Sequence, residues 1–125
     1  MINYTNLEQS RILAEILPIK SADGTWEKYI IAGNNLNISE KEQYIHKEDC
    51  PFIFYSGIGV PSWSLISLLN IIPGSVLTKY EDNWNCATFD KDNHFKDECF
   101  SDNPVDACYK LILKLHEQKF NFKNI

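Results

Sequence analysis

The sequence predicts an α+β fold, with three helices packed on a mostly antiparallel sheet of four or five strands. Three stretches carry helix caps and an apolar face, and short apolar segments separated by polar turns alternate with them. A chain of 125 residues fits a single domain, residues 1–125, with one core. Apolar residues make up 44% of the sequence, which excludes disorder as the state of the whole chain.

The first predicted helix starts at Thr5, which has the spacing of a capping box with Glu8. Pro18 ends it, because the residue before a proline avoids the α region. A turn at residues 23–24 and a strand over 25–32 follow. The apolar stripe of this helix is formed by Leu13, Ile16 and Leu17.

The middle of the chain is the least regular part. Residues 33–50 are polar and rich in asparagine, which favours a surface loop with a short helix. Residues 51–57 are typical of a short buried strand. The second helix then begins near Pro61 or Ser62, within GVPSWSLISLLNIIPG (59–74).

Three strands and a helix are predicted in the C-terminal part. Strands over 75–80, 83–90 and 94–100 are joined by short polar segments, as in a meander. The last helix has Asn103 as its cap, Pro104 at its first position and Asp106 in its first turn. Its predicted core face consists of Cys108, Leu111, Ile112 and Leu115.

Charge and composition exclude several classes of protein. The net charge of −5 disfavours nucleic acid as a partner, because phosphate binding usually needs a basic patch. No apolar run approaches the roughly 20 residues that span a bilayer, and no signal peptide is visible at the N-terminus. The spacing of the four cysteines matches no disulfide scaffold or zinc motif. We therefore expect a cytoplasmic protein with reduced thiols and no membrane contact.

Three sets of residues partly match catalytic or metal-binding patterns, but each lacks a required feature. Residues 90–94 alternate carboxylates as a calcium loop does, but Phe95 stands where that loop needs glycine. Cys86, His94 and Cys99 lack the paired spacing of structural zinc ligands. His46 and Cys50 form a poor pair of base and nucleophile, because the acidic residues beside Cys50 raise the pKa of its thiol. No metal, cofactor or catalytic residue is therefore predicted.

One candidate binding site remains, at the start of the second predicted helix. Its residues are Gly57, Gly59, Ser62, Trp63 and Ser64. A helix N-terminus and serine hydroxyls could hold an anion, the glycines would allow close approach, and Trp63 could stack on a flat group. Ordinary helix caps and a core tryptophan explain the same residues, so the sequence leaves both interpretations open.

Three motifs carry a resemblance to known proteins. These are LEQSRILAEILPIKSAD, PSWSLISLLNIIP and NPVDACYKLILKLHEQ, which together cover about a third of the chain. With them the sequence resembles a group of small uncharacterised proteins of gut Bacteroidetes genomes and their phages. The resemblance implies an accessory protein of phage or mobile-element origin and supplies no activity.

The predicted function is non-enzymatic binding. The chain would engage a host protein, or sequester a small anionic, nucleotide-like signal, in a counter-defence or host-modulating role. The alternatives are a small hydrolase or transferase acting on nucleotides, which would need a base near Ser62, and a structural or assembly protein that forms a homo-oligomer.

Overall fold

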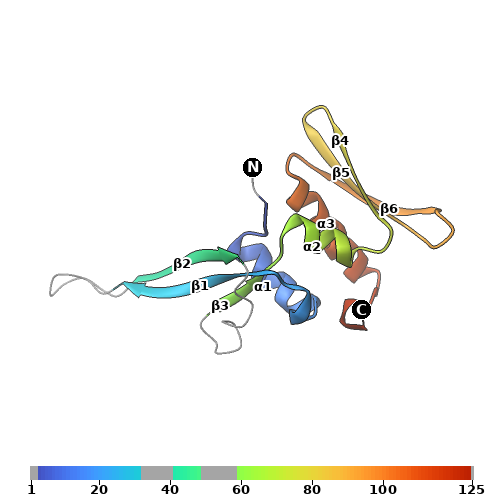
Figure 1. The fold of residues 1–125 in the computed structure, drawn as a ribbon. Helices are drawn as coiled ribbons and strands as arrows, with labels where there is room; N and C mark the ends of the chain where they lie inside the picture. The colour runs from blue at the N-terminus through green and yellow to red at the C-terminus, as the bar shows by residue number, and fades with distance from the viewer. Residues whose placement is uncertain (1–2, 32–40, 49–58, 125) are drawn as a thin grey trace.

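A computed structural model describes residues 3–31, 41–48 and 59–124. Helix α1 (Leu7–Ile16) leads through a short 3-10 turn (Ile19–Ser21) into β1 (Gly24–Ile31), and then come β2 (Lys41–Glu48), β3 (Gly59–Ser62) and α2 (Leu65–Ile71). Strands β4 (Ser75–Tyr80), β5 (Asn83–Phe89) and β6 (Phe95–Ser101), helix α3 (Pro104–Glu117) and a last 3-10 turn (Phe122–Asn124) complete the order. Helices α2 and α3 lie between two groups of strands (Figure 1).

The α+β class is confirmed, but the prediction of one sheet with four or five strands is wrong in detail. The described residues form two antiparallel sheets of three strands, in the orders β2-β1-β3 and β4-β5-β6. Helix α2 stands between β3 and β4 in the chain and packs against α3. The two groups of strands therefore pair only among themselves, and β3 packs against α1 whereas β5 and β6 pack against α3 (Figure 1).

The C-terminal meander and its helix are confirmed. Strand β5 pairs with β4 and β6 along its length. The Asn103 side chain accepts hydrogen bonds from the amides of Val105 and Asp106, which leaves Pro104 at the first helical position. The whole predicted core face of α3 is buried against β5 and β6.

Residues 41–48 form a strand, so the prediction of a loop with a short helix over 33–50 is wrong for this part. Strand β2 pairs antiparallel with all of β1, from Gly24 opposite Glu48 to Ile31 opposite Lys41. The backbone ladder with β1 stabilises it, and its polar side chains carry little strand signal. The rest of 33–50, and the predicted strand over 51–57, lie outside the described residues.

Both N-terminal helix caps differ from the prediction by one to three residues. The capping box of α1 consists of Asn6 and Gln9, not Thr5 and Glu8. Thr5 is instead fully buried. Helix α2 is capped by Ser64, so Pro61 and Ser62 belong to β3 rather than to the helix.

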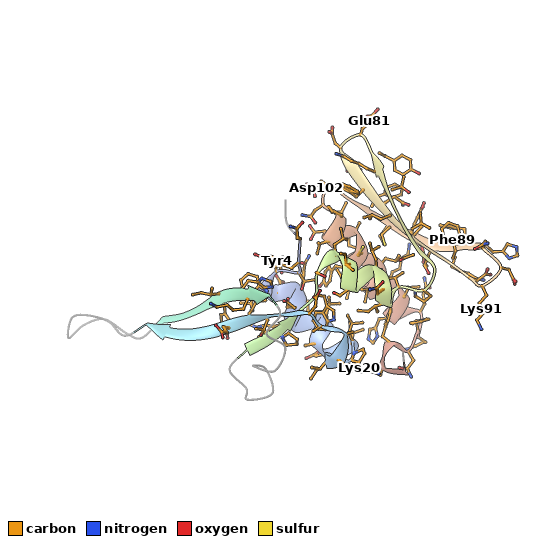
Figure 2. The ribbon with its side chains drawn as sticks, viewed as in Figure 1. Tyr4, Lys20, Glu81, Phe89, Lys91 and Asp102 are labelled. Carbon is orange, nitrogen blue, oxygen red and sulfur yellow. The ribbon has the colours of Figure 1, made fainter. Side chains whose placement is uncertain are left out.

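One cluster of buried apolar side chains joins α1, α2, α3 and β5 (Figure 2). Trp63, between β3 and α2, is completely buried within it. Burying a leucine- or phenylalanine-sized side chain contributes about 1.5–3 kcal/mol, so this cluster is the main source of stability. Its larger members are Leu13, Leu17, Trp63, Leu68, Leu111, Ile112 and Phe122.

Candidate functional site

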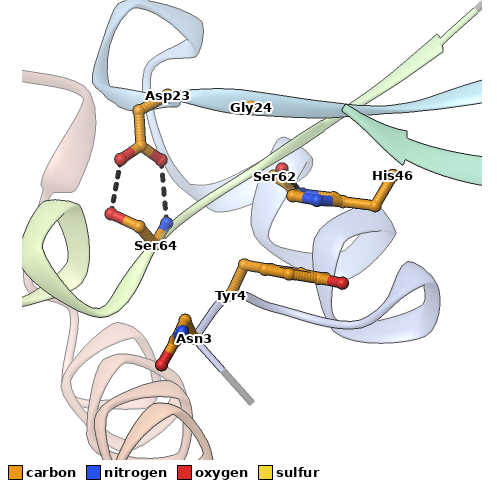
Figure 3. A pocket seen from close by; sticks show the side chains of 7 residues that line it. All are labelled: Asn3, Tyr4, Asp23, Gly24, His46, Ser62 and Ser64. Atoms are coloured by element: carbon orange, nitrogen blue, oxygen red, sulfur yellow. Dashed lines mark hydrogen bonds between the residues drawn. The ribbon is translucent and has the colours of Figure 1, made fainter. Parts of the chain in front are cut away.

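A polar hollow of about 130 Å³ lies where four segments of the chain meet. The N-terminal segment, the start of β1, the end of β2 and the β3–α2 junction each contribute side chains (Figure 3). Polar groups from distant parts of a sequence that converge on one hollow are typical of a binding site. The lining residues are Asn3, Tyr4, Asp23, Gly24, His46, Ser62 and Ser64.

Strand register places His46 and Ser62 on the same face of the β2-β1-β3 sheet. On β1, Gly24 lies opposite Ser62 of β3, and Trp26 lies opposite His46 of β2. Residues two apart on a strand share a face, so Gly24 and Trp26 bring their cross-strand partners to one side. The imidazole Nε2 and the Ser62 hydroxyl lie 2.8 Å apart, a hydrogen bond between the two outer strands.

Gly24 makes this contact across the central strand possible. A Cβ atom at this position would lie 2.6 Å from the Ser62 hydroxyl oxygen and 3.2 Å from Nε2 of His46. Any other residue would therefore have to push these side chains apart. The sequence predicts a turn at residues 23–24, whereas the structure shows that position 24 must lack a side chain so that Ser62 and His46 can meet.

Two aromatic rings hold the imidazole in place. Tyr4 stacks on His46 with ring centroids 3.5 Å apart and ring planes 4° from parallel. Trp26 meets His46 edge-on at 5.0 Å and donates from its indole nitrogen to the Thr5 carbonyl at 3.1 Å. Because Tyr4 also pairs with Ser64 through an isolated β-bridge, the N-terminal segment is part of the site.

Asp23 joins the start of β1 to the start of α2. One carboxylate oxygen accepts from the Ser64 amide at 2.8 Å, and the other accepts from the Ser64 hydroxyl (Figure 3). The Ser64 hydroxyl oxygen in turn accepts from the Ser67 amide at 3.2 Å, as an N-cap does. A negative charge from the protein itself therefore already stands at the first turn of α2, where the sequence interpretation places a bound anion.

The predicted site residues have different fates in the structure. Ser62 and Ser64 both line the hollow, although Ser62 is only 1% exposed. Gly59 begins β3 opposite Glu27, and Gly57 lies outside the described residues. Only part of the predicted set is therefore brought together around the hollow.

Trp63 does not line the hollow, and the expectation that it stacks on a ligand is corrected by its burial. Its side chain is 0% exposed, and its indole nitrogen donates to the Ser21 hydroxyl at 2.9 Å. Its backbone exchanges hydrogen bonds with Thr5, at 2.9 Å through the carbonyl and 3.1 Å through the amide. Trp63 therefore fixes the N-terminal segment and the β3–α2 junction against the core.

Sequence reasoning missed five of the seven lining residues, namely Asn3, Tyr4, Asp23, Gly24 and His46. In the sequence His46 pairs only with Cys50, four positions along the chain, whereas its structural partner Ser62 is 16 positions away. No spacing rule joins these residues. The pairing of β2 and β3 with the same central strand joins His46 to Ser62, whereas Tyr4 and Asp23 are joined to the site through Ser64.

Two other groups of reactive side chains were candidates for a site. Cys86 and Cys108 are both fully buried, with their sulfurs 3.4 Å apart. The hydrogen bond to Cys86, together with burial, raises the pKa of the Cys108 thiol, so this thiol is a poor nucleophile.

The side chains of Asp90, Asp92 and His94 also come close together, with ligand atoms within 4.8 Å of one another. Asp90 accepts from the Asp92 and His94 amides, both at 2.9 Å, and these hydrogen bonds hold the turn between β5 and β6. They also lower the pKa of Asp90, with the His94 amide making the largest contribution. The cluster is therefore explained as a turn.

Comparisons with models of known protein families, with curated proteins and with solved structures found no match. Within the described ranges, no helix combines the length and apolar character needed to cross a membrane. The chemistry of the hollow is therefore the main guide to function.

Proposed function

We propose that this chain is a non-enzymatic binding protein of phage or mobile-element type, which engages a host protein in the cytoplasm through the polar hollow. The observation that carries the proposal is that the hollow is preformed. His46 is held by Tyr4, Trp26 and Ser62, and Asp23 is held by two hydrogen bonds from Ser64. Side chains already ordered before binding lose little entropy when a partner docks.

The size of the hollow favours a group of a partner protein over a whole nucleotide. A volume of about 130 Å³ accommodates one side chain or a few waters, whereas sites that enclose drug-sized ligands run to roughly 300–1,000 Å³. The buried Trp63 is no stacking platform, and Asp23 opposes an anion at the start of α2. These points support the host-protein form of the function over sequestration of a nucleotide-like signal.

The test is to block the hollow without touching the core. Asn3 is exposed and lines the hollow, so Asn3→Trp fills the entrance. Glu117→Trp, at the exposed end of α3, adds the same side chain elsewhere. A host protein captured by the wild type and then purified should bind Asn3→Trp at least about tenfold more weakly, a loss of about 1.4 kcal/mol. Equal binding by Asn3→Trp and Glu117→Trp would contradict the proposal.

One observation favours a second candidate, a hydrolase or transferase acting on nucleotides. His46 stands 2.8 Å from the Ser62 hydroxyl, within reach for a base that activates a nucleophile. Against it, Ser62 is 1% exposed. The amides of Trp63 and Ser64 already donate to Thr5 and Asp23, so they are not available to stabilise an oxyanion.

Incubation of the purified chain with nucleotides, followed by chromatography, separates the two candidates. Non-enzymatic binding predicts no turnover and no labelling of Ser62 by a fluorophosphonate probe. Turnover by the wild type that disappears in Ser62→Ala would establish the enzyme instead.

A further inference from the structure

We propose that the hollow receives a positively charged nitrogen group, an alkylammonium or a guanidinium. This inference rests on the proposed binding function and names the chemistry that the site recognises. The charges of the lining residues are its starting point. Asp23 supplies a carboxylate, neither lysine nor arginine is among the seven lining residues, and His46 is the one lining side chain that can become cationic.

The remaining lining groups suit a donor-rich cation. The Ser64 hydroxyl, which uses one lone pair for the Ser67 amide, and the exposed Asn3 side-chain carbonyl can accept further hydrogen bonds, as an ammonium with three donors or a guanidinium with five requires. Tyr4 also lines the hollow, with one face of its ring stacked on His46. A neutral apolar group would offer no donor to the Asp23 carboxylate or the Asn3 carbonyl, whereas a cationic group would.

Asp23 is oriented by the protein and still has capacity to accept. Each of its oxygens takes one hydrogen bond from Ser64, and a carboxylate oxygen has two lone pairs. A cation that enters the hollow would therefore meet a carboxylate that is already fixed in position. Charge-assisted hydrogen bonds of this kind are about twice as strong as neutral ones.

The charge of the whole chain acts in the same direction. The net charge of −5 attracts cations and basic proteins over long range. The same chemistry could reach the site from two sources, the lysine or arginine side chain of a protein, or a free amine. The probes below distinguish these sources while testing the common chemistry.

The experiment is an NMR titration of the full ¹⁵N-labelled chain. The probes are N-acetyl-lysine N-methylamide, its arginine counterpart, free butylamine and the neutral N-acetyl-norleucine N-methylamide. We expect the cationic probes to shift the amide signals of Tyr4, Gly24 and Ser64, and the neutral probe to leave them unchanged. Tighter binding of the blocked amino acids than of butylamine assigns the site to a protein side chain, and the reverse assigns it to a free amine.

Two variants test the role of charge. Asp23→Asn keeps the shape of the carboxylate and should weaken cation binding by at least about tenfold. Asn3→Lys leaves Asp23 and its hydrogen-bond partners in place and adds an ammonium at the hollow. It should therefore weaken binding of the cationic probes without disturbing the fold. Asp92→Asn, in the exposed turn between β5 and β6, is the control that removes one charge elsewhere.

Three results would overturn the inference. These are equal binding of the norleucine and lysine probes, tighter binding of inorganic phosphate, titrated in the same way, than of any cationic probe, and unchanged binding of the lysine probe by Asn3→Lys. Failure of the cation chemistry is distinguishable from failure of the binding function. If Asn3→Trp abolishes capture of a host protein while no cationic probe binds, the hollow is a docking site for a group of different chemistry.

Discussion

The two ends of the molecule are stabilised in different ways. Helix α3 buries an apolar face against β5 and β6, with the two thiols of Cys86 and Cys108 in contact. Around the hollow, by contrast, side chains and backbone groups from distant segments exchange hydrogen bonds, as Thr5 and Asp23 do with the segment 63–64. The first region is held by close packing and by the hydrophobic effect, which has no preferred direction. The second region depends on hydrogen bonds between individual donors and acceptors.

The difference suggests which region carries stability and which carries specificity. Apolar packing tolerates many sequences of similar volume. A polar junction requires each partner, because a buried group that loses its partner costs its full desolvation energy. The following predictions test this contrast, in order of decreasing effect.

The largest effect is expected from Leu111→Ala in α3. Leu111 is completely buried in the apolar cluster, so the substitution removes packing and leaves a cavity. The free energy of unfolding should fall by about 2–5 kcal/mol in urea denaturation. Ile66→Ala, at a side chain that is 71% exposed, is the control and should change it by about 0.5 kcal/mol or less. If the two variants lost equal free energy of unfolding, the apolar cluster would not be the main source of stability.

Thr5→Val tests the polar junction with almost no change in shape. The Thr5 hydroxyl lies 2.7 Å from that of Ser10 and accepts from the Trp63 amide at 3.1 Å. Valine leaves this buried amide without its acceptor, so unfolding should become easier by about 1–3 kcal/mol. Thr78→Val on β4, which lies outside the buried set, should have little effect. A loss below about 0.5 kcal/mol for Thr5→Val would mean that the junction adds little stability.

Gly24→Ala tests whether space in the central strand controls the site. The new Cβ would lie 2.6 Å from the Ser62 hydroxyl oxygen, so the side chain of Ser62 must move away from His46. We expect a loss of about 1–2 kcal/mol, because the Ser62 side chain can rotate away while the Lys47 backbone carbonyl oxygen, 3.1 Å from the new Cβ, cannot. In a Ser62→Ala background the clashing oxygen is absent, so Gly24→Ala should cost clearly less in a double-mutant cycle. Additive losses would show that the strain lies elsewhere.

The smallest effect is expected at the ion pair between Lys114 and Asp97, whose charged atoms lie 2.8 Å apart. The hydrogen bond from Lys114 is the largest of the contributions that lower the pKa of Asp97. A carboxyl pKa that is lower in the folded state stabilises the fold above the unfolded pKa, and this contribution is lost as the pH falls through the folded pKa.

Lys114→Gln should therefore lower the free energy of unfolding least of the four variants near pH 7, and this loss should shrink in acid as Asp97 becomes protonated. Urea denaturation at several pH values measures the difference from the wild type. Lys110→Gln, one turn earlier on α3, is the matched control. A cost that is constant with pH would contradict the role of Asp97.

How far the sequence predicted the molecule depends on the range of the interactions. The caps and core face of α3 and the β4-β5-β6 meander were predicted because they depend on neighbours a few positions apart. Strand β2 was missed because its polar residues carry no period of their own, and its pairing with β1 stabilises it. The start of α2 was misplaced because Ser62 and Ser64 are equally good caps, and Asp23 selects Ser64.

The sequence by itself thus determined the α+β class, the C-terminal helix and its buried face, since periodicity and capping are local properties. Tertiary structure decided the division into two sheets, the burial of Trp63 and the hollow around His46, Ser62 and Asp23. These features depend on strand register and on hydrogen bonds between residues 16 to 58 positions apart, such as His46 with Ser62 and Thr5 with Trp63. Such contacts form only when the chain has folded, because no local preference brings their partners together.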